Sequence, residues 1–478
     1  MTLNTHEEAN TPNQYGWRQV APLQYSRPLG DMEKAFATLG AFGHAHDSEC
    51  SAIDFPTTFT YESTTEPDVT KAVRRVWQLM RLEFLTIGAT VDMKTKTMVY
   101  PAITSELDLE KFADETFHVV PWPFKTFDAV SLPKPSPVGF LYFCQKTPGS
   151  NVYEILPHTA HWRVDGFGGI QFVDKFLSAL SAGARVTSIP SIQEQVDKLP
   201  ATVEEMASIP ETPSPEATAL VAESTETMSN HMPSIGMRLT RPPTSRPGPV
   251  QNARVKLNKE ETMKLMKGCK SKGVKFMGAL NAAFVLALRK IAPENHKHRN
   301  YVSFIPISIR AMMPEPYGGA DYCMSASVFP VPLTQPYGSG FHEMATNFQK
   351  ACDVRNLPEF LSSVRLRASM FEKMVDFKPP EEWGPNTTAF LNPLGDIGVF
   401  VKPDRDLGVA KISVIDAFPS THVMAKENPI YTYIFRGELH FIANYNEAYY
   451  SHHELIRLME TFLYTLEEQL RPERQARL

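Results

Sequence analysis

The residues with the clearest capacity for chemistry lie in the stretch HTAHWRVDGFGG, residues 158–169. Within it, His161, Asp165 and Gly166 form the pattern HxxxDG. An imidazole with an ordinary pKa of about 6.5 can take the proton of an alcohol while that alcohol attacks a thioester carbonyl. In a chain with 14 histidines, chance alone produces this pattern only about 0.04 times. The stretch therefore predicts a general base at His161.

Each of these residues also has a plainer interpretation. His161 can be a hydrogen-bonded structural histidine. Asp165 can be a second catalytic carboxylate, but a carboxylate in a tight glycine-rich turn is more often structural, and we expect the structural role. His158, His161 and Asp165 are metal-ligand types within a short span. They straddle a predicted strand end, and no HExxH motif or cysteine cluster completes a site, so we expect no metal.

The elements around the motif are those that position a catalytic group rigidly. Residues 150–158 have the aromatic and β-branched content of a strand, and residues 168–180 have the apolar pattern of a helix. A short loop with His161 joins them, and Gly166 lets the chain turn sharply there. Upstream, Pro67 and Asp68 begin a predicted helix whose apolar face includes Val69, Val73, Val76, Met80 and Phe84.

The rest of the chain divides into a linker and a second predicted domain. Between residues 186 and 250 the composition shifts to Pro, Ser, Thr and Glu, which indicates a linker or surface crossover that is mobile around residues 210–227. Asn258 and Glu261 predict a helix start, and Gly268 its end. Residues 276–291 predict a helix buried on nearly every side, residues 431–445 a hairpin, and Ser451 with Glu454 the cap of a last helix. We expect domains at 1–185 and 251–478.

Composition excludes several classes of protein. A length of 478 residues suits two domains, and 42% hydrophobic with 21% charged residues is typical of globular chains. A net charge of -5 gives no basic field for nucleic acid. Five scattered cysteines without CxxC spacing, and the lack of an apolar leader or membrane span, predict a cytoplasmic protein with free thiols. We expect a monomer.

Four features in order resemble one known superfamily. They are the HxxxDG loop in mid-chain, the buried helix after a Pro-rich linker, the segment VSFIPISIR ending in Arg310, and the segment NPLGDIG at residues 392–398. This order is similar to that of the coenzyme A-dependent acyltransferase superfamily, which includes plant BAHD enzymes, alcohol acetyltransferases and condensation domains. Within it, the length, the linker and NPLGDIG in place of DFGWG most resemble fungal trichothecene 15-O-acetyltransferases.

The resemblance implies both a fold and a set of roles. The implied fold is α/β (α+β), with two chloramphenicol acetyltransferase-like lobes, each a mixed sheet packed with helices, and a tunnel between them. His161 would be the base, with Asp165, Gly166 and Arg310 supporting it, and Gly395 and Asp396 in a turn beside the tunnel. Acetyl-CoA would be a co-substrate, with no permanently bound cofactor, and a hydrophobic alcohol the acceptor. Asp165 is expected to pair with Arg310, which can serve both carboxylate oxygens.

Two departures from the superfamily pattern leave alternatives open. Condensation domains usually have a second histidine directly before the motif histidine, and Ala160 stands there in this chain. The missing DFGWG disfavours a plant BAHD assignment. The alternatives are a hydrophobic-ligand-binding protein of the same fold without turnover, and an acyltransferase or condensation-type enzyme whose donor is attached to a carrier protein.

Overall fold

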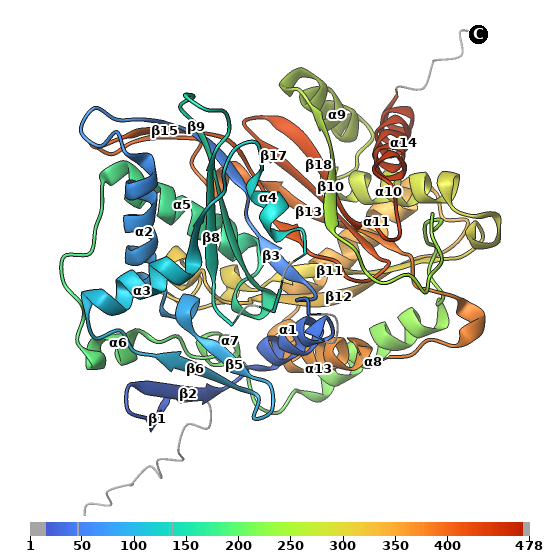
Figure 1. The fold of residues 1–478 in the computed structure, drawn as a ribbon. Helices are drawn as coiled ribbons and strands as arrows, with labels where there is room; N and C mark the ends of the chain where they lie inside the picture. The colour runs from blue at the N-terminus through green and yellow to red at the C-terminus, as the bar shows by residue number, and fades with distance from the viewer. Residues whose placement is uncertain (1–15, 45–46, 133, 136, 376, 472–478) are drawn as a thin grey trace, which may run out of the picture.

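The computed structural model describes residues 16–44, 47–132, 134–135, 137–375 and 377–471, and these form the expected α/β architecture. Figure 1 shows two large sheets side by side, with helices packed outside each of them. The buried apolar side chains correspondingly form two large clusters. One cluster consists mainly of side chains from the first half of the chain. The other consists mainly of side chains from the second half, together with those of the first helix.

The sheet that carries the motif is built around one central strand, β9 (Val152–Ala160). Strand β8 pairs with one edge of β9, and β3 and β4 pair end to end with the other edge. We call it the motif sheet. Its remaining strands have the bounds β3 Ala52–Asp54, β4 Thr57–Glu62, β7 Phe117–Val119, β8 Phe140–Gln145, β14 Asp404–Asp406, β15 Lys411–Ala417 and β16 Ser420–Thr421.

The second large sheet has the strand order β10-β18-β17-β13, and it mixes a parallel pair with antiparallel pairs. Two smaller sheets complete the fold, one with the order β1-β2-β6-β5 and one formed by β11 and β12. The bounds of these strands are β1 Arg18–Ala21, β2 Gln24–Pro28, β5 Thr90–Asp92, β6 Thr97–Pro101, β10 Val250–Leu257, β11 Tyr301–Ser308, β12 Val328–Gln335, β13 Ala389–Asp396, β17 Asn428–Phe435 and β18 Glu438–Asn446.

The helices cover the sheets in two groups, with one pair between them. Helices α2, α3 and α5 pack on the motif sheet side, α9, α10 and α14 pack on the second sheet side, and α1 packs against α13 (Figure 1). The helix bounds are α1 Asp31–Ala41, α2 Val69–Glu83, α3 Glu106–Thr116, α4 Thr126–Val130, α5 Gly166–Ala182, α6 Ile192–Lys198, α7 Val203–Met206, α8 Pro215–Asn230, α9 Lys259–Ser271, α10 Phe276–Ile291, α11 Phe341–Asp353, α12 Glu359–Ser362, α13 Val364–Val375 and α14 His452–Leu470.

Most of the predicted local elements are present. Helix α10 has the predicted bounds and buries almost all of its side chains, and α2 begins after Asp68, which caps it. Asn258 and Ser451 each form a capping box with the predicted glutamate. Strands β17 and β18 form the predicted hairpin, whose turn places Arg436 and Gly437 at positive φ angles of 51° and 80°. Sequence patterns and capping residues were sufficient to predict these elements, because the interactions that determine them are between residues close in the sequence.

Two sequence interpretations differ from the structure. Gly268 does not end a helix: α9 continues to Ser271, and Gly268 faces α14, where a Cβ atom would lie 3.1 Å from Cβ of Leu470. The segment 186–250 contains α6, α7 and α8, which its composition did not indicate, and its role as a linker or crossover stays a prediction. Helix α8 begins at Pro215 after the Ser214 cap and buries Ala217, Val221 and Met228. The mobility of residues 210–227 stays a prediction.

The two halves of the chain exchange elements. Strands β14, β15 and β16, from residues 404–421, pair in the motif sheet with strands of the first half. Arg405 of β14 also donates a 2.6 Å hydrogen bond to Asp174 of α5. In return, α1 packs with the core of the second half. The boundaries at residues 185 and 251 stay a prediction, and the motif sheet takes strands from both sides of them.

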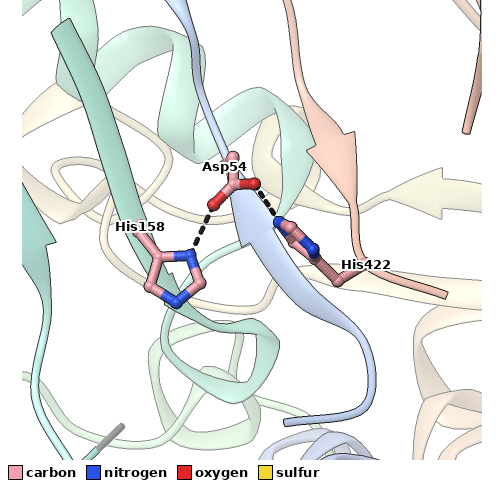
Figure 2. A group of neighbouring side chains, drawn as sticks. All are labelled: Asp54, His158 and His422. Atoms are coloured by element: carbon pink, nitrogen blue, oxygen red, sulfur yellow. Dashed lines mark hydrogen bonds and ion pairs between the residues drawn. The ribbon is translucent and has the colours of Figure 1, made fainter. Parts of the chain in front are cut away.

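A buried cluster of Asp54, His158 and His422 joins three strands of the motif sheet (Figure 2). Asp54 faces His158 across the β3–β9 pair, and His422 follows β16, which pairs with the other edge of β3. Nδ1 of His158 lies 2.6 Å from one Asp54 oxygen, and Nε2 of His422 contacts the other. All three side chains are at most 4% exposed. The Asp54 carboxylate therefore links β9 to the residue after β16, a strand that the second half of the chain contributes to the motif sheet.

The two imidazoles keep this carboxylate ionised. Burial pushes the pKa of Asp54 upward, but the charges and hydrogen bonds of His422 and His158 outweigh burial, and the pKa lies below its ordinary value. A carboxyl group whose pKa is lower in the folded state stabilises the fold above its unfolded pKa of about 3.9, and that stabilisation is lost as the pH falls through the folded pKa.

We predict that Asp54→Asn lowers the free energy of unfolding by roughly 3–5 kcal/mol at pH 7, because one partner of a buried charged cluster is removed. Urea denaturation across pH should show the gap to wild type closing as the pH falls below about 4. Asp321→Asn is the matched control, since Asp321 is 77% exposed and pairs only with Lys175 at the surface. Equal stability of Asp54→Asn and wild type at pH 7 would contradict the prediction.

Candidate active site

His161 stands at the end of the central strand of the motif sheet. Strand β9 ends at Ala160, residues 161–163 form a single 3-10 turn, and α5 begins at Gly166. The predicted strand, loop and helix are therefore present in that order. Because β9 is hydrogen-bonded along both edges, it holds the start of the turn firmly.

Arg163 anchors the same turn, and the sequence interpretation missed it. Its guanidinium group is 1% exposed and lies 4.1 Å above the ring of Trp162. It donates to the backbone carbonyls of Thr86 and Ala89, each at 2.7 Å. Burial lowers the pKa of Arg163 to about 9. No charge pattern in the sequence signals this role, because the acceptors are backbone carbonyls.

Asp165 points away from His161 and is fully buried. Its Oδ1 accepts a 2.8 Å hydrogen bond from the Gly168 N–H and thereby caps α5. Its Oδ2 accepts from the Ser327 N–H at 2.7 Å and from Nη2 of Arg310 at 2.9 Å. The predicted contact with Arg310 is therefore present. The expectation that Arg310 serves both oxygens is wrong, because backbone N–H groups provide the other two bonds.

Arg310 is held by carbonyl groups as well as by Asp165. Its guanidinium donates to the carbonyls of Tyr322, Cys323 and Ser325 at 3.3, 3.1 and 2.7 Å. Gly168 is packed against this group so closely that a Cβ atom would lie 2.1 Å from the Cys323 oxygen. Gly166 has no such restriction, since its nearest neighbour to a Cβ atom is Pro419 at 3.8 Å. The packing therefore requires glycine at Gly168, and also at Gly169, where a Cβ atom would lie 1.8 Å from the ring of Phe55; both lie outside the HxxxDG pattern.

The ring of His161 is half-buried, and its surroundings are apolar. Its Nδ1 is enclosed and has no hydrogen-bond partner among the described residues. Phe36 of α1 stacks on the ring with 3.9 Å between centroids and 8° between planes. Burial lowers the pKa of His161, although its own backbone carbonyl, the charge of Asp165 and the backbone of Val164 oppose this. A neutral imidazole at pH 7 is the protonation state that a general base needs.

His158 does not join His161 and Asp165, so the metal interpretation of these three residues has no geometric support. His158 instead contributes to the cluster with Asp54 and His422, whose ligand-type atoms lie within 4.8 Å of one another. Ligands of a tetrahedral metal at about 2.0 Å lie about 3.3 Å apart. The 2.6 Å separation of Nδ1 from Oδ1 is that of a hydrogen bond. The cluster is therefore held together by hydrogen bonds.

Gly395 and Asp396 are the last two residues of β13, and a 3-10 turn at Ile397–Val399 follows them. Gly395 has a φ angle of 77°, and Asp396 accepts a 2.9 Å hydrogen bond from the Gly398 N–H. The predicted turn is present, and its position beside a tunnel stays a prediction. A cavity of about 210 Å³ adjoins the His161 turn through Trp162 and also borders Ala37 of α1, Val91 and Met93.

Within the described ranges, no helix has the length and apolarity needed to cross a membrane. No protein-family model matches the sequence.

Two curated fungal proteins are similar to this chain over most of its length. The acetyltransferase pigO of Monascus ruber is 25% identical over 447 residues, which are 91% of this chain and 94% of that protein. The O-acetyltransferase pigM of Monascus ruber is 21% identical over 442 residues, 91% of this chain and 83% of that protein.

Solved structures show the same fold. The TRI3 trichothecene 15-O-acetyltransferase of Fusarium sporotrichioides matches with a TM-score of 0.79 and 15% identity, covering 96% of this chain and 98% of that chain. The first condensation domain of the CDA synthetase matches with a TM-score of 0.61 and 13% identity, covering 93% and 95% of the two chains. In sequence the chain is thus similar to fungal acetyltransferases, and it has the fold shared by the TRI3 acetyltransferase and this condensation domain.

Proposed function

We propose that this chain is an O-acyltransferase of secondary metabolism that transfers an acyl group, with acetyl as the first candidate, from coenzyme A to the hydroxyl of a hydrophobic small molecule. His161 is the general base. The observation that carries the proposal is the environment of His161: a half-buried ring on a rigid strand end, with a lowered pKa and an enclosed Nδ1. No permanently bound cofactor is needed.

The mechanism follows from the open edge of the ring. Because Nδ1 is enclosed, Nε2 is the nitrogen that a substrate can reach. Nε2 takes the proton of the alcohol as its oxygen bonds to the thioester carbonyl carbon. The tetrahedral intermediate then breaks the C–S bond, the ester leaves, and the coenzyme A thiolate receives the proton from the imidazolium. Atoms and charges balance without an enzyme nucleophile.

The cysteines support direct transfer. All five are free, and four of them are buried. Burial raises the pKa of each thiol to about 11 or 12, so little thiolate is present at neutral pH. A ternary complex of enzyme, acyl-CoA and alcohol is therefore the simplest arrangement. Asp165, Gly166 and Arg310 support the base from behind, with Gly395 and Asp396 in a turn beside the channel.

The names of the similar proteins indicate two candidate classes of acceptor alcohol. The C-15 hydroxyl of a trichothecene is the candidate favoured by the match in fold to TRI3 over nearly the whole chain. An azaphilone alcohol is the candidate favoured by sequence, since the azaphilone biosynthesis cluster protein M of Aspergillus terreus is 21% identical over 304 residues. Incubation with acetyl-CoA and each alcohol, followed by mass spectrometry of the products, decides between them.

The same assay tests the alternatives. A protein that only binds ligands releases no free thiol from acetyl-CoA, with or without an alcohol. An enzyme that depends on a carrier protein transfers the acyl group from an acylated phosphopantetheine carrier but not from acetyl-CoA. Thiol release that requires both acetyl-CoA and an alcohol supports the proposal, and in the proposed enzyme the cytoplasm supplies the acetyl-CoA.

We predict that His161→Ala lowers kcat by roughly 10²- to 10⁴-fold, because a positioned general base contributes about that much. Calorimetric titration with coenzyme A should give an unchanged affinity. His453→Ala is the control, since His453 is exposed at the start of α14 and undergoes the same chemical change. If His161→Ala keeps activity within about threefold of wild type, His161 is not the base.

We predict that the intact mass of the protein stays unchanged after incubation with acetyl-CoA alone. Direct attack by the alcohol leaves no acyl-enzyme intermediate. A control incubation with the alcohol present should produce ester and free thiol. A stable mass increase of one acetyl group on any Cys or Ser, competent for transfer to the alcohol, would establish a covalent route instead.

We predict that Asp165→Asn lowers both activity and stability. The asparagine NH2 group would oppose either the Gly168 N–H or both the Ser327 N–H and the Arg310 guanidinium, and breaking a buried pair costs roughly 3–5 kcal/mol. Activity should fall because the turn that holds His161 shifts, so kcat should fall more than the affinity for coenzyme A. Denaturation curves and steady-state kinetics measure the two effects. Asp396→Asn is the comparison, since Asp396 is exposed and accepts one bond from its own turn. If Asp165→Asn is as stable as wild type and has the wild-type kcat, Asp165 does not support the site.

A further inference from the structure

The ring of Phe36 lies flat on the ring of His161. The two planes are 8° apart with centroids at 3.9 Å, and Phe36 is 7% exposed. Phe371 of α13 contacts Phe36 from its far side, edge to face at 5.7 Å. Helix α1 packs against the His161 turn as well as against α13. Phe36 is thus clamped between the candidate base and a helix from the second half of the chain.

No side chain among the described residues accepts a hydrogen bond from Nδ1 of His161. A carboxylate or carbonyl commonly accepts from Nδ1 and so sets the plane and tautomer of the ring. In the described part of the chain, Nδ1 of His161 has no side-chain partner and no hydrogen bond of ordinary geometry, although the backbone of His161 and Val164 favours the protonated ring. Asp165 is occupied by Gly168, Ser327 and Arg310. The stacked phenyl ring is therefore the side-chain contact that limits rotation of the imidazole out of its plane.

The phenyl face also suits the charged state of the base. The face of an aromatic ring carries negative potential and attracts a cation within about 6 Å. Charged groups on the surrounding elements are engaged elsewhere: Glu33 of α1 with Arg27, Glu372 of α13 with Thr38, Arg367 of α13 with Ser363, and Arg163 with backbone carbonyls. Asp165 is the charged side chain that raises the pKa of His161, and the face of the phenyl ring acts in the same direction.

We propose that Phe36 is a positioning residue for the acyl transfer: its ring holds the His161 imidazole with Nε2 toward the reacting hydroxyl and stabilises the imidazolium that forms as the proton moves. The proposal rests on His161 being the base. Transfer of the alcohol proton to Nε2 creates a cation in an apolar site, and the stacked ring is the side chain in face-to-face contact that favours it.

The decisive experiment replaces Phe36 with phenylalanines carrying one to three ring fluorines in the full-length enzyme. Fluorination weakens the negative potential of the face while nearly preserving size and burial. With acetyl-CoA and the acceptor alcohol, kcat should fall stepwise by roughly 2- to 30-fold in total, with an unchanged KM for acetyl-CoA. The pKa in the pH profile of kcat should move downward, because the imidazolium loses stabilisation while burial is unchanged.

Ordinary substitutions provide the packing controls. Phe36→Leu keeps apolar bulk and loses the ring face, so it should lower kcat at least as much as full fluorination. Phe371→Leu removes the next ring outward and should leave the kinetic pKa unchanged. Circular dichroism verifies that both variants are folded. If fluorination changes neither kcat nor the kinetic pKa, or if Phe371→Leu shifts that pKa as much as Phe36→Leu, packing accounts for the contact and the proposal is wrong.

A double variant separates this proposal from the proposed function. In a His161→Ala background, Phe36→Leu should have no further effect on kcat, because the ring acts through the imidazole. If His161→Ala itself retains activity, the assignment of the base fails. If His161→Ala is inactive but all Phe36 variants match wild type, the base stands and only the role of Phe36 is refuted.

Discussion

The Asp165 carboxylate is the point on which the geometry of the site depends. It is fully buried, and burying a charge requires that each of its oxygens be hydrogen-bonded. Its partners come from three places in the chain: Gly168 in the first turn of α5, Arg310 two residues after β11, and Ser327 just before β12. Because these distances are all between 2.7 and 2.9 Å, the loop that contains His161 cannot shift relative to the second half without breaking a charged contact.

The same dependence on both halves recurs around the base. Strand β9 is fixed through His158 and Asp54 to His422, which follows a strand supplied by the second half. The ring above His161 comes from α1, which belongs to the core of the second half although it lies early in the sequence. The turn that holds His161, the proposed base, is therefore assembled from long-range contacts, and its formation is coupled to folding of the whole chain.

Sequence patterns predicted what local interactions determine. The cap at Asn258, the buried helix α10 and the β17–β18 hairpin are set by residues within a few positions of each other, so their signals are visible in the chain. The contact between Asp165 and Arg310 was predictable only through resemblance, because 145 positions separate the two residues. Phe36, His422 and the anchoring by Arg163 carry no local signal at all. Helix α8 escaped prediction because its buried residues, Ala217, Val221 and Met228, are sparse among polar ones.

His158 and His161 lie on either side of Ala160 at the end of β9, and their surroundings differ. His158 has a structural role, whereas His161 is the proposed base. His158 donates to a carboxylate and is bound into the sheet, whereas His161 faces a phenyl ring and keeps one edge open. A carboxylate beside His161 would make its imidazolium easier to form but would also keep more of the base protonated at neutral pH. An aromatic face is a weaker attraction, so it favours the cation during proton transfer while burial keeps the resting ring neutral. Placing Asp165 behind the turn, with its charge absorbed by Arg310 and two backbone N–H groups, is what leaves His161 in that balance.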